Sequence, residues 1–440
     1  MHGAGLVDSL HFMPVVLCGW CHCKAAYTEL CRTGYHFYVT ESGEVMTSEE
    51  RHEARYRRRK ARRDSKRKKV LETYGDYYKV INRDALSGAA KQAAKGVKYK
   101  ASVQRFMLRR LTNVAVINKN LVYHKDIRKG FICFILMERG KLRKIMSVHF
   151  SERVPQKSLN QNALIPVLTR SLIHDNGASQ KGKGTGFAMK RLVRHLRWHF
   201  RRFGNEGYIL LVDFSDYFGT IDHEIAKQII AAAFDDPGII WLANLFIDAY
   251  YEFNVKFKKI PEEEAHKGLG LGSEINQTVA ITYPNRMDHY IKEVLGIKCY
   301  GRYMDDFYLI HPSKEYLTYC MGEIKRICAD LKITVNEKKT GVVKLAHGFT
   351  FLKTKVYLTD TGKIIRKPCH KAIVQERRKL KKQKKLLDAG VMTFSDIRCS
   401  YSSWRGSMKY RNARKTVHSM DKLYDSLFIE SWRKGGVQRG

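Results

Sequence analysis

YMDDF at residues 303–307 is the stretch that decides the fold, because it sets two adjacent carboxylates in the middle of an apolar segment. Residues 298–311 are apolar on both sides of this pair, which predicts a hairpin with a buried centre rather than a surface turn. Adjacent residues on a strand point to opposite faces. Asp305 and Asp306 therefore serve one site equally only where a turn redirects one of them.

A third carboxylate occupies a similar place upstream. Asp213 lies near the end of the apolar run 208–214, which predicts a buried strand. Charged groups in such surroundings are costly unless they are paired or bind a metal. Converging carboxylates suit Mg²⁺, and two such ions can clamp both reacting oxygens of a phosphoryl transfer. We expect Asp213 and Asp305 to bridge two Mg²⁺ ions, with Asp306 more peripheral and Mn²⁺ as an alternative metal.

Further motifs accompany these acids in a fixed order. They are VDFSDYFGTIDH at 212–223, KGLGLGSEINQ at 267–277, NEKKT at 336–340 and GFTFL at 348–352. With YMDDF, this ordered set resembles the bacterial reverse transcriptases, in particular the defence-associated and retron-like group. The resemblance extends from about residue 142 into the C-terminal helices. RNA-dependent RNA polymerases have a similar palm, but typically carry an acid where Phe218 stands and a glycine where Met304 stands.

The resemblance implies an α+β fold shaped as a right hand. Its parts are the fingers, a palm with an antiparallel sheet backed by helices, and a helical thumb. The expected divisions are an N-terminal segment of uncertain role at 1–45, a basic extension at 46–96, fingers at 97–206, a palm at 207–358 with a fingers-associated insert at about 234–267, and a basic thumb at 359–440.

The resemblance also implies roles for individual residues. The catalytic metal ligands are Asp213, Asp305 and Asp306, joined by the backbone carbonyl of Phe214. The residues expected to bind the incoming nucleotide are Arg143, Lys141, Phe218, Gly272, Gln277 and Lys339. Those expected to bind the template or primer are Lys181, Lys183, Phe349 and Leu352.

Several of these roles have alternatives. Arg143 fits phosphate oxygens, but it also fits an exposed hairpin charge. Phe218 is expected to exclude a ribose 2′-hydroxyl, and it can pack in the core as well. The family has a lysine in the motif at 336–340 that is expected to protonate the departing pyrophosphate, and Lys338 matches its position as well as Lys339 does. Leu271 stands where many family members have glutamine, which resembles the enzymes of diversity-generating retroelements.

The positive charge predicts a polyanionic partner. Lysine and arginine number 81 against 43 acids, a formal net charge of +38. Nucleic acid is the expected partner, because phosphate contacts explain such an excess. The run RHEARYRRRKARRDSKRKK at 51–69 is predicted to be a nucleic-acid arm, with a solvated helix face as the alternative.

Periodicity predicts the remaining elements. Helices are expected at 102–120, 161–173, 187–203, 273–293 and 314–331, and strands at 131–137, 144–150, 334–336 and 350–358. Residues 367–385 and 400–415 are expected to form basic thumb helices. In the second, Trp404 fits core packing better than contact with a nucleic-acid duplex.

Cysteines and apolar stretches indicate a compartment. The ten cysteines are mostly scattered, which suggests reduced thiols, and no stretch is long enough to span a bilayer. We expect a cytoplasmic protein. One cluster, Cys18, Cys21, His22, Cys23 and Cys31, has partial zinc-like spacing. The alternative is a dispensable leader, with translation starting at Met46.

The expected function is an RNA-directed DNA polymerase that uses deoxynucleoside triphosphates, an RNA template and a DNA product. A dedicated, structured non-coding RNA in antiphage defence is the expected template. The alternatives are the reverse transcriptase of a diversity-generating retroelement or a group II intron. An RNA-binding protein with an inactive palm is the alternative from another class, and the intact set of three acids argues against it.

Overall fold

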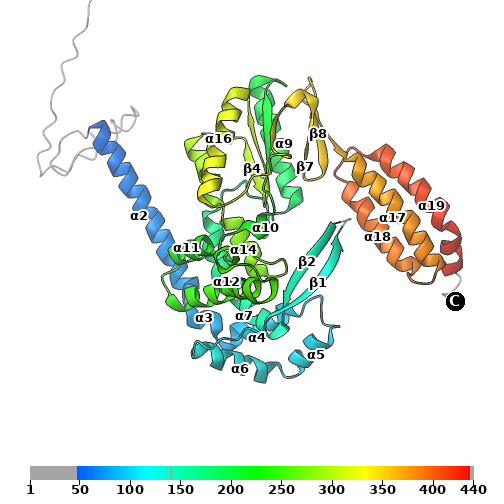
Figure 1. Ribbon diagram of the computed structural model, residues 1–440. Coiled ribbons are helices and arrows are strands. Elements are labelled where there is room, and N and C mark those ends of the chain that lie inside the picture. The colour runs from blue at the N-terminus through cyan, green and yellow to red at the C-terminus, as the bar shows by residue number, and fades with distance from the viewer. Residues whose placement is uncertain (1–46, 139–140, 437–440) are drawn as a thin grey trace, which may run out of the picture. The chain divides into compact units, whose positions relative to one another are not determined.

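The computed structural model of the chain describes residues 47–138 and 141–436, without the side chains of 138, 141 and 430–436 (Figure 1). The cysteine and histidine cluster at 18–31 and Met46 lie outside the described residues. The chain divides into two compact units, Met1–Val70 and Leu71–Gly440. The predicted boundaries between fingers, palm and thumb stay predictions.

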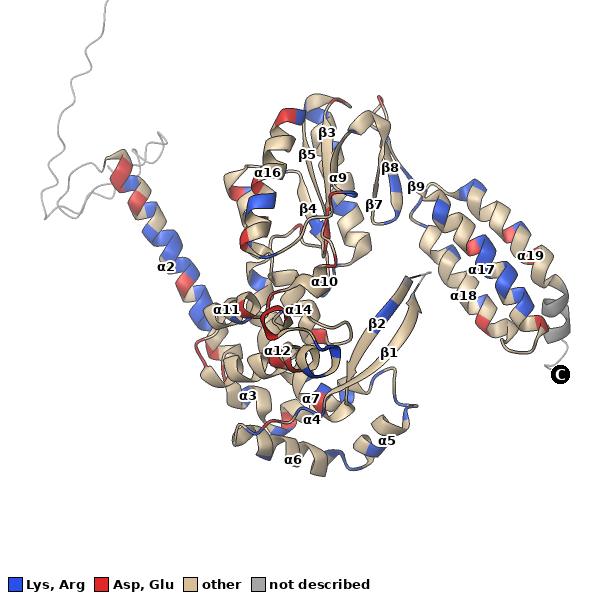
Figure 2. Cartoon of the chain, viewed as in Figure 1, with Lys and Arg blue, Asp and Glu red and all other residues tan. Residues whose placement is uncertain are grey.

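Helix α2, Ser48–Tyr74, carries the described part of the first unit and contains the basic run at 51–69. None of its residues is buried, and Figure 2 shows lysine and arginine gathered along it. Thr47 and Glu50 bond to each other's backbone N–H groups at its start, and Arg57 pairs with Glu53 at 2.8 Å. Local pairs of this kind support a helix that has no apolar face to pack.

The fingers are helical apart from one hairpin. Their elements are α3 Tyr77–Ile81, α4 Arg83–Ala93, α5 Ala101–Leu108, α6 Arg110–Val122, β1 Phe131–Glu138, β2 Lys141–Val148, α7 Phe150–Leu159, η1 Asn160–Leu164, α8 Ile165–Leu168, η2 Thr169–Ser171 and α9 Thr185–Phe203. The predicted hairpin is confirmed, with strands that extend closer to its turn. The single helix predicted at 102–120 is wrong, because Arg109 leaves helical geometry at ψ 38°. The helix predicted at 161–173 is instead a succession of π, α and 3-10 turns.

The palm consists of a four-stranded antiparallel sheet, in the order β4-β5-β3-β6, and its helices. Its elements are β3 Tyr208–Asp213, α10 Tyr217–Thr220, α11 His223–Ala233, α12 Pro237–Lys258, α13 Glu262–Ala265, α14 Glu274–Thr282, α15 Asn285–His289, η3 Tyr290–Val294, β4 Tyr300–Tyr303, β5 Asp306–His311, α16 Lys314–Asp330 and β6 Gly341–Lys344. Side chains of Asp222, Asp236 and Ser313 cap α11, α12 and α16. This arrangement confirms the α+β class and the sheet backed by helices.

Two palm predictions need correction. The helix predicted at 273–293 breaks after Thr282, because Pro284 lacks the N–H that a continuous helix needs. The strand predicted at 334–336 is a single antiparallel bridge between Phe214 and Val335.

A second sheet follows, in the order β7-β8-β9, made of β7 Phe349–Phe351, β8 Thr354–Leu358 and β9 Ile364–Pro368. The turn η4, Leu345–His347, precedes it. The single strand predicted at 350–358 is wrong, because Leu352 and Lys353 adopt φ of +46° and +59° and reverse the chain. Two successive residues of positive φ are the geometry of a tight hairpin turn.

The thumb contains the helices α17 His370–Asp388, α18 Phe394–Met408 and α19 Arg414–Gly436. They pack around their own apolar cluster, which includes Leu380 and Tyr401, with the half-buried Trp404 against it. The helix predicted at 400–415 breaks after Met408. The following loop is fixed to the second sheet. Asn412 donates its N–H to the Arg366 carbonyl at 2.6 Å and accepts the Arg366 N–H at 2.9 Å.

Among residues 47–138 and 141–436, no helix combines the length and apolarity that crossing a membrane requires.

Candidate active site

Three acids meet where the central strands of the palm sheet end. Asp213 on β3 lies directly opposite Asp306 on β5 in the strand register. Asp305 lies in the turn between β4 and β5, and its carbonyl accepts the Phe214 N–H at 3.3 Å. Met304, with φ of +56°, forms the turn that redirects the chain. Asp306 was expected to be more peripheral, but it is the direct strand partner of Asp213.

The electrostatics of the acids reflect their crowding. Burial raises the pKa of Asp305, and the charge of Asp213 raises it further. Burial also raises the pKa of Asp306, together with the charge of Asp305 and a hydrogen bond with Asp213. Like charges this close are difficult to ionise together. Binding of cations would therefore stabilise the ionised form of this cluster.

Lys339 supplies one positive charge to this cluster. Its Nζ lies 2.6 Å from Oδ2 of Asp213, and this hydrogen bond raises the pKa of Lys339. The same oxygen accepts a 3.3 Å hydrogen bond from Asn336 Nδ2, while the Asn336 N–H binds the Asp213 carbonyl at 2.8 Å. Lys338 is exposed and has no such contact. Of the two lysines considered, the structure brings Lys339 to the acids.

The glycine-rich turn at residues 267–273 is joined to the hairpin of β1 and β2. The Met146 N–H donates to the Leu271 carbonyl at 3.0 Å, and Ile145 forms a parallel bridge with Leu271. Gly272 has φ of +133°, and a Cβ there would meet the Met146 carbonyl oxygen at 2.7 Å, so this position requires glycine.

Arg143 lies two residues before Ile145 on the same face of β2. Its charge lowers the pKa of Asp305, which places its guanidinium within electrostatic reach of the acids. Gln277 is exposed on α14. The side chain of Lys141 lies outside the described residues.

Phe218 packs in the core, and its predicted role at the sugar of the incoming nucleotide stays a prediction. It is half-buried on α10, packs against the main core and meets the Tyr217 ring edge-on at 5.9 Å. Its carbonyl accepts the Leu269 N–H at 2.8 Å, which ties α10 to the glycine-rich turn. The ring therefore has a fixed position with part of its surface uncovered.

The residues predicted to bind template or primer differ in their availability. The Nζ of Lys183 donates to the carbonyls of His174 and Asn176, both at 3.0 Å, so this lysine holds its own loop together. Lys181 is exposed. Phe349 is buried at 3% exposure, whereas Leu352 lies half-exposed in the β7–β8 turn. Of these four, Lys181 is exposed, Lys183 and Leu352 are partly exposed, and Phe349 is buried.

The acids have the chemistry of a divalent-metal site. Three carboxylates and the Phe214 carbonyl form an all-oxygen donor set, which suits Mg²⁺. The described part of the chain holds no ready-formed metal cluster of three or more His, Cys, Asp or Glu side chains. Lys339 occupies an oxygen of Asp213 that a metal would need. The residues fit a metal once this ammonium group moves.

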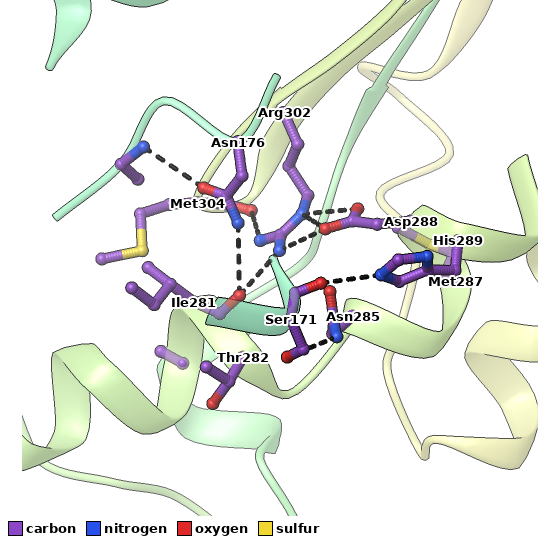
Figure 3. Close-up of polar contacts among 12 residues, drawn as sticks. Ser171, Asn176, Ile281, Thr282, Asn285, Met287, Asp288, His289, Arg302 and Met304 are labelled. Carbon is purple, nitrogen blue, oxygen red and sulfur yellow. Dashed lines mark hydrogen bonds and ion pairs between the residues drawn. The ribbon is translucent and has the colours of Figure 1, made fainter. Parts of the chain in front are cut away.

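Arg302 and Asp288 have no place among the residues predicted for the site. They form a fully buried ion pair at 2.7 Å behind the turn that carries Asp305 (Figure 3). The signal was available, because Arg302 is a charge within the same apolar hairpin that singled out the acids.

The stretch of sequence that carries this site matches a known protein family. Residues 139–356 match the family model described as reverse transcriptase (RNA-dependent DNA polymerase). This stretch contains all three acids together with Arg143, Phe218 and the lysine that pairs with Asp213. The chain therefore contains a reverse-transcriptase domain. That domain indicates an RNA-directed DNA polymerase, which is a nucleotidyltransferase.

Two telomerases are among the solved structures that the chain matches. A telomerase from Candida albicans, in complex with a fragment of telomeric RNA, has 12% sequence identity and a TM-score of 0.41, covering 68% of this chain and 60% of its own. An apo telomerase from Candida tropicalis, truncated from its C-terminal domain, has 14% identity and a TM-score of 0.41, covering 54% of this chain and 55% of its own. The chain thus spans less than two thirds of both. No curated protein matches the sequence.

Proposed function

We propose that this protein copies RNA into DNA, adding deoxynucleotides to the 3′ end of a primer with the help of two Mg²⁺ ions. One observation carries the proposal. Asp213, Asp305 and Asp306 meet at one end of the palm sheet, with Lys339 against them and the charge of Arg143 within reach. A protein that only binds RNA has no use for buried acids near phosphates, because they repel each other.

The chain's own residues have separable tasks in this reaction. The three acids and the Phe214 carbonyl would hold the divalent ions, which activate the primer hydroxyl and neutralise the triphosphate. Arg143 has the planar fork that suits phosphate oxygens. Lys339, which pairs with Asp213 at 2.6 Å, would give up this oxygen to a bound ion and would be placed to donate a proton to the departing pyrophosphate. The Phe218 ring excludes a 2′-hydroxyl from the sugar site.

Primer extension tests this proposal. The full chain is incubated with an RNA template, a DNA primer and either deoxynucleotides or ribonucleotides, with Mg²⁺ or with a chelator. We expect extension with deoxynucleotides and Mg²⁺ alone, and none by the matched Asp305→Ala chain. RNA binding without extension under every condition would instead indicate an inactive palm.

The finer proposal concerns the template. We propose a dedicated, structured non-coding RNA, copied during antiphage defence in the cytoplasm of a bacterium. Exposed basic residues on α2, α9 and α17 support it, because a polymerase cleft alone needs less basic surface. A diversity-generating retroelement or a group II intron is the competing source of the template.

Purification at high salt tests whether the protein holds one dedicated RNA or binds RNA of any sequence. Salt strips RNA held by charge alone, whereas a specific complex resists it. We expect one RNA species to stay bound and a defined stretch of it to be copied into DNA. Random cellular RNA after the same wash would reject the dedicated template, and would leave the polymerase proposal intact.

A further inference from the structure

Arg302 is a fully buried cation within bonding distance of the catalytic turn. It lies on β4, two residues before Met304, and its side chain has 0% exposure. Its only acidic partner among the described residues is Asp288 of α15, which is also 0% exposed. Burial alone would lower the pKa of Arg302, but the charge of Asp288 raises it, so Arg302 stays a cation.

The guanidinium reaches three separate parts of the palm (Figure 3). Nε and Nη2 donate to the two oxygens of Asp288, at 2.8 and 2.7 Å for the shortest contacts. Nη2 also donates to the Ile281 carbonyl on α14 at 2.7 Å. Nη1 donates to the Met304 carbonyl at 3.0 Å. Arg302 therefore ties the catalytic turn to α14 and α15.

The contact with Met304 bears on the geometry of Asp305. Met304 has φ of +56°, which is unfavourable for a residue with a Cβ and needs support from its surroundings. Arg302 holds the carbonyl of Met304, and the Phe214 N–H holds the carbonyl of Asp305 at 3.3 Å. The peptide before Asp305 and the peptide after it are thus both held by a hydrogen bond.

The backbone of Arg302 adds a second connection. Its N–H donates to the Asp175 carbonyl at 3.1 Å, and its carbonyl accepts the Gly177 N–H at 2.9 Å. These bonds join the open edge of β4 to the start of the glycine-rich loop at residues 176–186. The position of β4, and with it the turn, is therefore fixed at the side chain and at the main chain.

We propose that Arg302 is a positioning residue, which sets the Met304–Asp305 turn so that the Asp305 carboxylate faces Asp213 and the two together bind divalent metal. The inference rests on the proposed function for its biological purpose. Stability alone does not explain the pair, because an apolar pair of similar volume usually replaces a buried ion pair without loss of stability. An apolar pair cannot replace the hydrogen bond to Met304.

This difference gives the experiment. The double variant Asp288→Leu/Arg302→Met removes both charges and the hydrogen bonds that the pair makes with Met304, Ile281 and Tyr300. We expect its melting temperature to stay within a few degrees of the wild type. Its affinity for Mn²⁺, measured by electron paramagnetic resonance without substrate, should fall about 10- to 100-fold, as for the loss of other groups that orient metal ligands. The Mn²⁺ concentration for half-maximal primer extension should rise in parallel.

Two matched variants complete the design. Arg302→Lys keeps a cation beside Asp288 but lacks the fork, so it should weaken Mn²⁺ binding as the double variant does. Glu323→Leu/Arg326→Met removes an ion pair of 2.8 Å on the surface of α16, and should leave Mn²⁺ affinity unchanged. Asp305→Ala gives the background signal.

The outcomes are decisive in both directions. Unchanged Mn²⁺ affinity in a folded double variant, or in Arg302→Lys if the double variant does not fold, would overturn the inference. So would a wild-type chain that binds no Mn²⁺ above the Asp305→Ala background. Because metal binding is measured without polymerisation, a chain that binds Mn²⁺ through Arg302-dependent geometry but extends no primer would reject the proposed function alone.

Discussion

Arg302 of the palm and the basic residues of helices α2 and α17 carry the same charge in opposite surroundings. The Arg302 side chain has 0% exposure and is bonded to a carboxylate and two carbonyls. No residue of α2 is buried, and Lys381 and Lys382 of α17 face outward. Figure 2 shows such residues along both helices.

The difference teaches what each charge is able to do. In a buried site the partners fix a charge in place, salt screens it little, and removing one partner leaves the other exposed to a large penalty. On an exposed helix a charge is screened by salt and replaceable by its neighbours. We therefore expect buried charges in this protein to set geometry and exposed charges to set affinity for polyanions.

The largest effect is expected from the buried acids. Asp213→Ala, Asp305→Ala and Asp306→Ala should each lower DNA synthesis on the order of 1000-fold or more, since charge stabilisation at the reacting phosphate is lost. RNA binding, measured by filter retention, should stay nearly intact. Glu262→Ala, which removes an exposed acid of α13, serves as the control. Full polymerisation by Asp305→Ala would contradict the proposed chemistry.

A buried acid of the fingers gives the next largest effect. Burial raises the pKa of Glu152 to about 7, against 4.5 for an exposed glutamate. The folded state holds this proton more tightly, so the contribution of Glu152 to stability is full below pH 4.5 and is lost as pH rises through about 7. The decline amounts to about 3 kcal/mol at most.

Melting temperatures at several pH values test this expectation. Glu152→Gln cannot ionise, so its melting temperature should fall less than that of the wild type between pH 5 and pH 8. Glu262→Gln, an exposed counterpart, should follow the wild type. Parallel curves for the wild type and Glu152→Gln would show that this carboxyl does not govern the pH dependence.

A substitution of Phe218 tests the proposed sugar discrimination without changing a charge. Phe218→Ala removes a ring that is fixed on α10 and should improve the use of ribonucleotides relative to deoxynucleotides roughly 10-fold or more, as for the loss of a packing wall. Single-nucleotide insertion rates with both sugars measure this ratio. Tyr410→Ala, which alters an exposed thumb aromatic, is the control. Unchanged discrimination would restrict Phe218 to core packing.

The smallest effect is expected from the exposed helix. A chain lacking residues 46–69 should bind a structured RNA a few-fold more weakly. The slope of log affinity against log salt should decrease by roughly 0.9 for each phosphate that the shortened chain no longer neutralises. A chain of full length with glutamine for the lysines and arginines of 51–69 should behave alike. An unchanged slope in both would mean that α2 is a solvated helix and no binding arm.

The sequence predicted the acids and the palm sheet because apolar strands with charges near their ends are a strong local signal. Asp213, Asp305 and Asp306 meet as expected, and the hairpin of the fingers is confirmed. Such features depend on alternation within a few residues.

Other features depend on contacts that no local pattern contains. Lys183 bonds to two carbonyls of its own loop, which the sequence does not reveal, and its predicted contact with template or primer stays a prediction. Nothing in NEKKT tells that Lys339 rather than Lys338 reaches Asp213, since both lie in one exposed turn. Leu352 and Lys353 form a hairpin turn without the asparagine or glycine that usually marks one.

The connection between the second sheet and the thumb has a mechanical consequence. The chain passes from β9 into α17 near Cys369, and the loop before α19 returns to the sheet through Asn412, which bonds to Arg366 in both directions. Arg411 adds a contact with the Thr354 hydroxyl of β8 at 3.3 Å. A body attached at one point swivels freely, whereas one attached at two points turns about the line that joins them. Two attachments to the second sheet thus leave the three helices fewer ways to rotate against it than a single connection would.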